Sequence, residues 1–157
     1  MAEFSPKFKE ALSLVQKPGR YTGGEPGCIY KDKSKVDVRM AFCFPDTYEI
    51  GMSNIGMRIL YGLMNEMPGV WCERVFAPWG DMEAEMRKHA IPLYALESHD
   101  PVKAFDLIAF TIGYEMSYTN ILNMLELSCV PLLAREREGL ENIVFAGGVC
   151  AVNPEPL

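Results

Sequence analysis

The sequence lacks the features that usually mark a metal site, a membrane segment or a nucleic-acid surface. Its five cysteines form no C-x-x-C pair and it has two histidines, so it offers no recognisable structural zinc site. It has no apolar run near the roughly 20 residues that span a bilayer, and no secretory signal at its start. The formal net charge is −6, and the acidic and basic residues are scattered along the chain, which disfavours a nucleic-acid surface and a polybasic membrane patch.

What is present fits one globular domain. Hydrophobic residues make up 49% and charged residues 23% of the 157 residues, ordinary values for a folded chain of this length. The odd number of cysteines, placed inside apolar runs, indicates reduced thiols. We therefore expect a small cytoplasmic domain with no nucleic-acid or membrane partner.

The first 35 residues are predicted to be a helix followed by a leader loop. Ser5 and Pro6 are typical of a helix start, and Pro18 with Gly19 would stop the helix. Residues 23–35 are rich in glycine and charge and are predicted to be a surface loop. We expect residues 36–157 to form the α/β domain.

Short apolar strands alternate with amphipathic helices through the rest of the chain. The predicted strands are Val36–Phe44, Val70–Phe76, Leu93–Leu96, Leu107–Ile112 and Ile143–Ala146. Helices are expected from Ser53, from a cap at Asp81, and over Tyr118–Cys129. The first of them is expected to bury Ile55, Ile59, Leu60, Leu63 and Met64. This alternation predicts a five-stranded parallel sheet of flavodoxin-like order, with helices on both faces.

Three long turns follow predicted strands, over residues 45–53, 113–120 and 147–154. The carboxyl ends of parallel strands lie at one sheet edge, and glycine allows a ligand close to the backbone there. The chain has no G-x-G-x-x-G and no G-K-[ST], so it lacks the usual dinucleotide and phosphate-loop motifs. The pattern indicates a ligand edge, although such turns can also simply cap helices.

Four segments resemble a known family. They are Pro45–Arg87 (beginning PDTYEIGMSNIG), Gly113–Leu125 (GYEMSYTNILNML), Ala146–Leu157 (AGGVCAVNPEPL) and Lys17–Gly27 (KPGRYTGGEPG). Together they resemble the amino-terminal cobalamin-binding region of a bacterial family of cobalamin-binding radical-SAM proteins. The resemblance implies a flavodoxin-like domain that holds cobalamin at the carboxyl ends of its strands.

The resemblance also implies which residues contact the cofactor. Many cobalamin domains carry D-x-H-x-x-G after the first strand, with histidine as lower cobalt ligand. Here Tyr48 stands at the histidine position, so we expect cobalamin without a histidine ligand and no metal-ligating residue in this chain. The lower face of the cobalt would be unligated, bound to water or covered by Tyr48. The implied cofactor-binding residues are Asp46, Thr47, Tyr48, Gly51, Ser53, Thr111, Gly113, Tyr114, Ser117, Gly147 and Gly148.

The chain departs from a complete radical-SAM enzyme in one respect. The C-x-x-x-C-x-x-C spacing that holds a four-iron cluster is absent, and the sequence ends at residues 153–157, where family members continue toward a catalytic barrel. We expect a non-catalytic fragment whose partner is the radical-SAM catalytic domain. S-adenosylmethionine and the four-iron four-sulfur cluster would belong to that domain.

Two other functions stay open at this point. A domain of this fold that has lost its cofactor could serve only as an interaction or regulatory domain. Alternatively, a flavodoxin-like domain could bind a flavin or another nucleotide. Self-association is a further expectation, because an isolated module exposes the surface that normally meets its partner.

Overall fold

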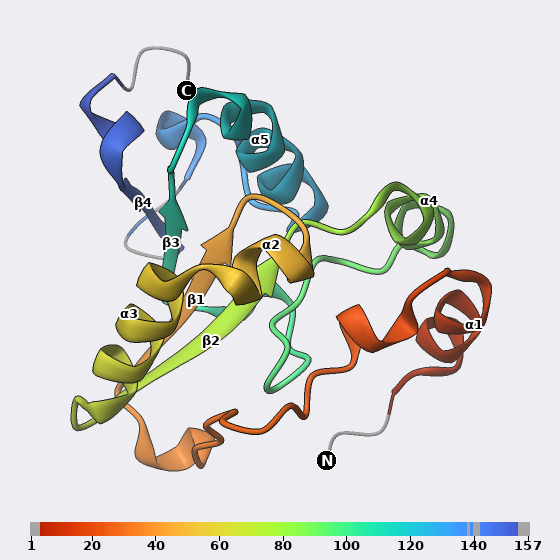
Figure 1. Cartoon of the computed structure of the whole chain (residues 1–157), viewed down its shortest axis with the longest axis horizontal. Coiled ribbons are helices and arrows are strands. Elements are labelled where there is room, and N and C mark those ends of the chain that lie inside the picture. The colour runs from red at the N-terminus through yellow and green to blue at the C-terminus, as the bar shows by residue number, and fades with distance from the viewer. Residues whose placement is uncertain (1–3, 138, 140–141, 154–157) are drawn as a thin grey trace.

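The computed structural model describes residues 4–137, 139 and 142–153. Its helices are α1 (Pro6–Leu14), α2 (Tyr48–Ser53), α3 (Ile55–Glu66), α4 (Gly80–His89) and α5 (Tyr118–Leu127). Its strands are β1 (Val38–Phe44), β2 (Val70–Phe76), β3 (Leu107–Thr111) and β4 (Ile143–Gly147). These four strands form one parallel sheet in the order β2-β1-β3-β4 (Figure 1). The predicted α/β architecture and amino-terminal helix are confirmed.

The register brings all strand ends to the same edge. In β1, Met40 pairs with Cys72 of β2 on one side and with Leu107 of β3 on the other. Leu107 in turn pairs with Ile143 of β4. All four strands are parallel, but β2 lies on one side of β1 whereas β3 and β4 lie on the other, so the strand order reverses between β1 and β3. This is the place where open α/β sheets bind ligands.

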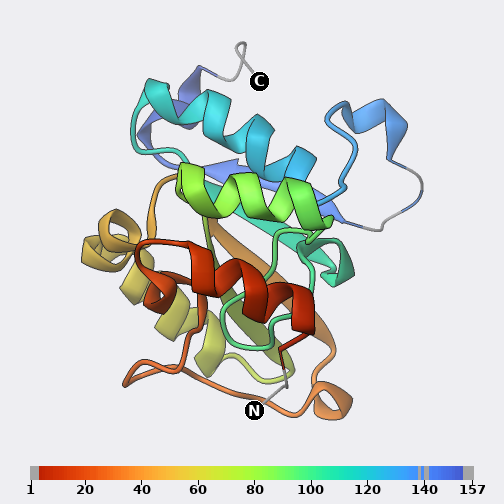
Figure 2. The ribbon, with the colours of Figure 1, turned by 90° about the vertical axis from the view of Figure 1, so that its right-hand side faces the viewer.

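The helices cover the two faces of the sheet unequally. Helices α4 and α5 lie over one face with α1 beside α4, and α3 lies on the other face (Figures 1 and 2). Ala41 and Cys43 of β1 are fully buried. Helix α3 packs against β2, whereas Phe145 of β4 stays 46% exposed. The α3 side of the sheet is therefore left open over β3 and β4.

The prediction of a strand at Leu93–Leu96 is wrong, so the sheet has four strands in the described residues instead of five. This segment makes one isolated antiparallel bridge, between Tyr94 and Pro101. The backbone turns back on itself at His99, whose φ is +58°. All four residues of the segment are nevertheless buried, so its apolar run signalled burial rather than a strand.

The prediction of which residues the first long helix buries is also wrong. A separate short helix, α2, comes first, and α3 begins after Asn54, whose Oδ1 accepts a hydrogen bond from the Met57 amide at 2.9 Å. Met57, Tyr61 and Asn65 are buried, whereas Ile55 is 72% exposed. Ile59, Leu60 and Leu63 are also exposed, and Met64 is half-buried. Because α3 is apolar on almost every side, periodicity could not select the inner face.

The other boundaries differ by one or two residues from those expected. Strand β1 starts at Val38, β3 ends at Thr111, β4 includes Gly147, and α5 ends at Leu127. Trp79 rather than Asp81 is the N-cap of α4, and an Asp81 carboxylate oxygen instead accepts a hydrogen bond from the Gln16 amide at 2.9 Å. The limits of β2 are those predicted.

The leader segment, residues 17–35, is fastened along β2 and α3. The Tyr61 hydroxyl accepts a hydrogen bond from the Ile29 amide at 2.7 Å, and the indole of Trp71 donates to the Ile29 carbonyl at 3.0 Å. The Arg74 guanidinium donates to Glu25 at 2.9 Å. These contacts tie residues expected to be a surface loop to the side of the sheet. The division into residues 1–35 and 36–157 stays a prediction.

Two general features accord with the composition. All five cysteines are free thiols. No helix in the described part of the chain has the length and apolarity to cross a bilayer.

Candidate functional site

An apolar groove of about 350 Å³ lies between α3 and the exposed part of the sheet. It sits over β1 and β3, where the strand order reverses, and extends to β4. Its walls come from β1, α3, β3, β4 and the turns that follow β3 and β4. They comprise Met40, Phe42, Asn54, Gly56, Met57, Leu60, Met64, Ala109, Phe110, Thr111, Ile112, Gly113, Phe145, Gly147 and Gly148. A groove of this size and lining suits a small apolar ligand.

The structure brings four predicted site residues together at this groove. Thr111 ends β3 and is directly paired with Gly147 of β4, and Gly113 and Gly148 follow in the adjoining turns. A Cβ atom added at Gly113 or at Gly147 would meet no other atom within 4 Å. These two glycines therefore leave space at the carboxyl edge of the sheet that larger residues would fill.

Gly148 has a different role. Its φ is +120°, and an added Cβ would collide with the backbone carbonyl of Ile112. The turn is also held by hydrogen bonds from the Ile112 amide to the Gly147 carbonyl at 2.7 Å and from the Cys150 amide to the Ile112 carbonyl at 3.2 Å. Glycine at 148 is therefore required by the fold itself.

The predicted residues of the turn after β1 lie outside the groove. Asp46 accepts a hydrogen bond from the Thr47 amide at 2.7 Å, and Thr47 is the N-cap residue of α2. The hydroxyl of Ser53 donates to the Ile50 carbonyl at 2.7 Å. Gly51 is buried and faces the ring of Phe76, which leaves no room for a side chain. These residues shape the turn and the start of α2.

Tyr48 points away from the groove, into the region held by the leader. Its ring meets Phe76 edge-on, with the ring centroids 5.4 Å apart, and with Thr47 it lines a narrow crevice beside Arg20. Burial and the nearby Glu25 carboxylate raise the pKa of the Tyr48 phenol above its usual value. Tyr48 is therefore a neutral phenol at physiological pH, poorly suited to ligate a metal ion.

The remaining two predicted residues, Tyr114 and Ser117, lie in the turn after β3 but do not line the groove. Tyr114 is exposed, and Ser117 is buried as the N-cap of α5. The turns after the strands are nevertheless joined. The Asn120 amide donates to the Pro45 carbonyl at 2.9 Å, and the Tyr118 hydroxyl donates to the carbonyls of Cys150 and Asn153 at 3.1 and 2.9 Å. Residues 154–157 of the third turn and of the family resemblance lie outside the described residues.

The groove offers binding surface rather than catalytic groups. Thr111 and Asn54 are its polar side chains, and no histidine lines it. The Nε2–H of His99 donates to the Thr22 carbonyl of the leader, 3.1 Å away, and burial lowers the pKa of His99. His89 lies beside Glu85. Within residues 4–137, 139 and 142–153, no three His, Cys, Asp or Glu side chains are grouped as a metal site.

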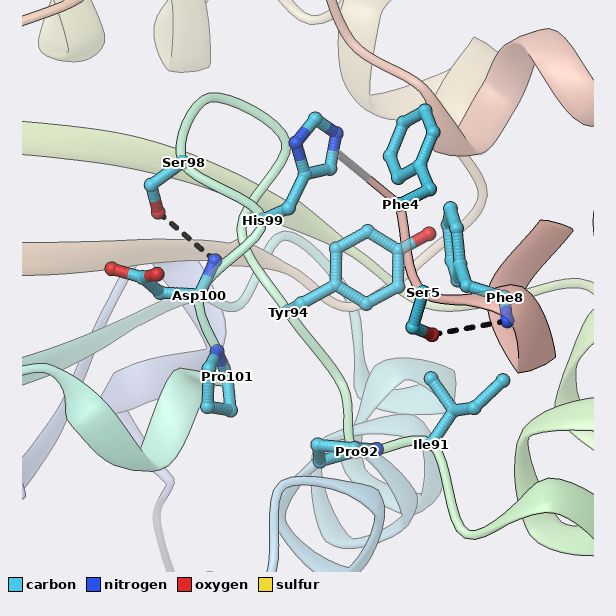
Figure 3. Close-up of a pocket in the computed structure, with 10 residues that line it drawn as sticks. All are labelled: Phe4, Ser5, Phe8, Ile91, Pro92, Tyr94, Ser98, His99, Asp100 and Pro101. Carbon is cyan, nitrogen blue, oxygen red and sulfur yellow. Dashed lines mark hydrogen bonds between the residues drawn. The ribbon is translucent and has the colours of Figure 1, made fainter. Parts of the chain in front are cut away.

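A second hollow, of about 310 Å³, lies between α1 and the loop that precedes β3. Figure 3 shows the rings of Phe4, Phe8, Tyr94 and His99 gathered along it. Phe8 and Tyr94 meet edge-on at 5.1 Å, and Phe4 meets His99 at 4.6 Å. None of the predicted site residues lies here. This aromatic cluster attaches α1 to the rest of the domain.

Most of the groove's walls come from residues that the sequence does not single out as site residues. Met40 and Phe42 alternate along β1, a signal for one face of a strand, but that face was expected to be covered by a helix. Leu60 and Met64 were expected to be buried against the sheet, and instead form the helical wall of the groove. Phe145 lies in a strand without polar residues, so no alternation of polar and apolar residues marks its side chain as facing a groove.

Comparison with known proteins adds one finding. A family model described as "Radical SAM proteins, N-terminal" matches residues 56–157, which is more than half of the chain and includes all of α3 but its first residue and every strand after β1. Neither the curated proteins nor the solved structures contain a match to the chain.

Proposed function

Since the chain belongs to the radical SAM proteins as part of their amino-terminal region, we propose that it binds a corrinoid such as cobalamin. The observation that carries the proposal is the apolar groove at the point where the strand order reverses, with Gly113 and Gly147 leaving its floor open. In this proposal the chain is a cofactor-binding module. Radical SAM chemistry, with S-adenosylmethionine and a four-iron cluster, belongs to the parent protein.

The residues present fit the aromatic base at the end of the nucleotide tail of such a cofactor. The groove volume of about 350 Å³ is large enough for a bicyclic base, and six of its fifteen lining residues are methionine or phenylalanine. Thioether and aromatic groups pack well against a flat ring. The Thr111 hydroxyl, at the end of β3, is the polar group available to orient it. When bound, the corrinoid would supply organometallic chemistry at cobalt, and the chain would hold and orient it.

We expect this chain to bind cobalt without a histidine ligand. Tyr48 is turned toward Phe76 and Glu25, and both histidines of the chain are engaged away from the groove. Electron paramagnetic resonance of the Co(II) form tests this in protein labelled with ¹⁵N-histidine. Cobalt signals unchanged by the label support the proposal, whereas a change in nitrogen hyperfine splitting would overturn it.

The primary test is retention of hydroxocobalamin after desalting, measured by its visible absorbance. We expect the wild-type chain to retain about one equivalent per chain, as one groove per domain implies. Gly147→Leu should abolish retention, because the new side chain enters the groove. Gly62→Leu is the matched control: an added Cβ there also meets nothing within 4 Å, but Gly62 lies on a different side of α3 and does not line the groove.

The same assay separates the other two functions. Preferential retention of flavin mononucleotide would indicate a flavin-binding domain. Failure of the folded wild-type chain to retain either compound would indicate an interaction domain without a cofactor. Equal retention by both glycine variants would show that the corrinoid lies elsewhere on the chain.

A further inference from the structure

A second groove lies on a different side of α3, between that helix and the leader segment. Its volume is about 710 Å³, larger than that of the groove over β1 and β3. Its walls come from the leader segment, α2 and α3, with the side chain of Arg74 from β2. None of the residues predicted to bind the cofactor lines it, so this groove is separate from the proposed corrinoid site.

One wall of the second groove is an exposed aliphatic surface. Ile55 and Ile59 are one turn apart on α3 and are 72% and 56% exposed. Ile29 lines the same groove from the leader, where hydrogen bonds to Tyr61 and Trp71 hold its backbone. An aliphatic chain in the groove would remove this surface from water, which favours binding.

Two glycines keep the second groove open. A Cβ atom added at Gly27 or at Gly62 would meet no other atom within 4 Å. Gly27 has a φ of +93°, which glycine adopts more readily than other residues. Gly62, in contrast, lies inside α3, where glycine lowers helix stability relative to alanine. The open space beside Gly62 is therefore a feature that the helix itself does not need.

The charged side chains that line the second groove are two arginines. Arg58 is exposed, and no described carboxylate forms an ion pair with it. The Arg74 guanidinium is buried, and its Nε and Nη2 atoms donate to Glu97 and Glu25. The Arg74 Nη1 atom carries two N–H groups, and its described partner is the Met52 sulfur at 3.1 Å, a weak acceptor. The lining therefore offers hydrogen-bond donors to an anionic group.

We propose that the second groove binds a small amphiphile with an aliphatic chain and one carboxylate, such as a medium-chain carboxylic acid. The chain would lie against Ile29, Ile55 and Ile59. The carboxylate would accept hydrogen bonds from Arg58 and from Nη1 of Arg74, since arginine is well suited to bind a carboxylate.

The charge around the second groove favours a carboxylate over a phosphate. The carboxylates of Glu25 and Glu97 hold Arg74 and repel further negative charge. A carboxylic acid brings one negative charge, with which Arg58 can pair. A phosphate monoester brings about −1.5 to −2 at neutral pH, so it would be repelled more strongly.

Isothermal titration calorimetry with decanoate, in the absence of corrinoid, tests this site. We expect the wild-type chain to bind about one equivalent, as one groove per domain implies. Gly62→Leu should weaken binding about tenfold or more, because the new side chain enters the second groove. Gly147→Leu is the matched control: it places the same side chain in the other groove and should leave decanoate binding unchanged.

A charge variant tests the position of the carboxylate. Arg58→Gln should weaken decanoate binding about three- to tenfold, because it removes an ion pair at a solvent-exposed position. Arg135→Gln, which removes an exposed arginine beyond α5, is the control and should have no effect. Far-ultraviolet circular dichroism checks that each variant is folded.

A series of chain lengths tests the aliphatic wall in the wild-type chain alone. The affinity should rise from hexanoate through octanoate to decanoate, by roughly fourfold for each methylene that is fully buried. This measurement does not depend on whether any variant folds.

Three results would overturn the proposal: a folded wild-type chain that does not bind decanoate, wild-type affinity in Gly62→Leu or Arg58→Gln, or an affinity that does not change with chain length. Loss of decanoate binding in Gly147→Leu alone would place the ligand in the other groove and would also contradict it. The titration uses no corrinoid, so its failure leaves the proposed cofactor untouched. Failure to retain hydroxocobalamin, in turn, would contradict only the proposed function.

Discussion

Arg74 is a buried cation that joins the leader segment to the sheet. Its side chain is held by Glu97 at 2.7 Å and by Glu25 at 2.9 Å, and its guanidinium lies 5.2 Å from the centre of the Tyr61 ring. Glu97 is fully buried, so this ion pair exists only because both partners are hydrogen-bonded. Glu25 and Cys28, which also contacts the Arg74 guanidinium, are the members of the cluster that come from the leader.

The Glu25 carboxyl should make stability depend on pH. Burial would raise its pKa, but hydrogen bonds from Cys28 and Arg74 and the nearby Tyr48 hydroxyl lower it to about 2. A carboxyl whose pKa is lowered by folding stabilises the fold above its unfolded pKa and loses that contribution as the pH falls through the folded value. The window is therefore from about pH 4.5 down to about pH 2.

We predict that Glu25→Gln lowers the free energy of unfolding by about 1–3 kcal/mol at pH 7, and by progressively less toward pH 2. Urea unfolding of wild-type and variant chains at several pH values measures the difference. Glu10→Gln, on the exposed side of α1, is the control and should have little effect at any pH. A loss from Glu25→Gln that is equally large at pH 7 and near pH 2 would contradict this linkage.

At the scale of elements, Asn65 fastens α3 to the outer edge of β2. Its side-chain amide donates to the carbonyls of Tyr61 and Cys72 at 3.0 and 2.9 Å, and its oxygen accepts from the Cys72 amide at 3.1 Å. The side chain therefore bonds to β2 as the backbone of a neighbouring strand would. These bonds hold the Asn65 side of α3 against the edge of β2, on the same side as the buried Met57 and Tyr61.

We predict that Asn65→Ala lowers the free energy of unfolding by about 2–4 kcal/mol, because the Cys72 amide and carbonyl lose their buried partners. Asn123→Ala, which removes a half-buried amide that contacts Arg87 and Glu83, should cost less than about 1 kcal/mol. Chemical denaturation of both variants gives the comparison. Similar losses for the two would mean that the buried bonds of Asn65 contribute little.

The elements also show what the sequence could and could not predict. Strand β2 was predicted with its limits, and β1, β3, β4 and α5 within two residues, because each is an apolar run bounded by turn residues. The prediction of a strand at Leu93–Leu96 failed because a segment that is buried without pairing in a sheet has the same run of apolar residues as a strand. The turns at 113 and 147 were placed at one edge correctly, since parallel topology requires it, whereas the inward face of α3 depends on the long-range bonds of Asn65.

At the scale of the whole molecule, ligand binding should raise thermal stability. A ligand that binds only the folded chain stabilises it by RT ln(1 + [L]/Kd), about 2.7 kcal/mol at a hundredfold excess over Kd. We therefore predict that hydroxocobalamin raises the Tm of the wild-type chain and of Gly62→Leu by several degrees, a shift of ~4 °C or more.

Gly147→Leu should keep a cooperative thermal transition but show no such shift, since its groove is filled. Differential scanning calorimetry with and without the corrinoid measures both quantities. A shift of the same size in Gly147→Leu would place the ligand outside the groove and contradict the proposed site.

The fastening of the leader has a consequence for how the domain can be shortened. A polypeptide that begins at Val36, the boundary suggested by the sequence, would lose Lys31 from the Val70 carbonyl and Ile29 from Trp71. The outer edge of β2 would then lose the partner of its Val70 carbonyl. Such a polypeptide would also lose α1, whose Phe8 and Ala11 are buried in the core. Trimming the first 35 residues should therefore destabilise the fold and leave a strand edge that favours aggregation.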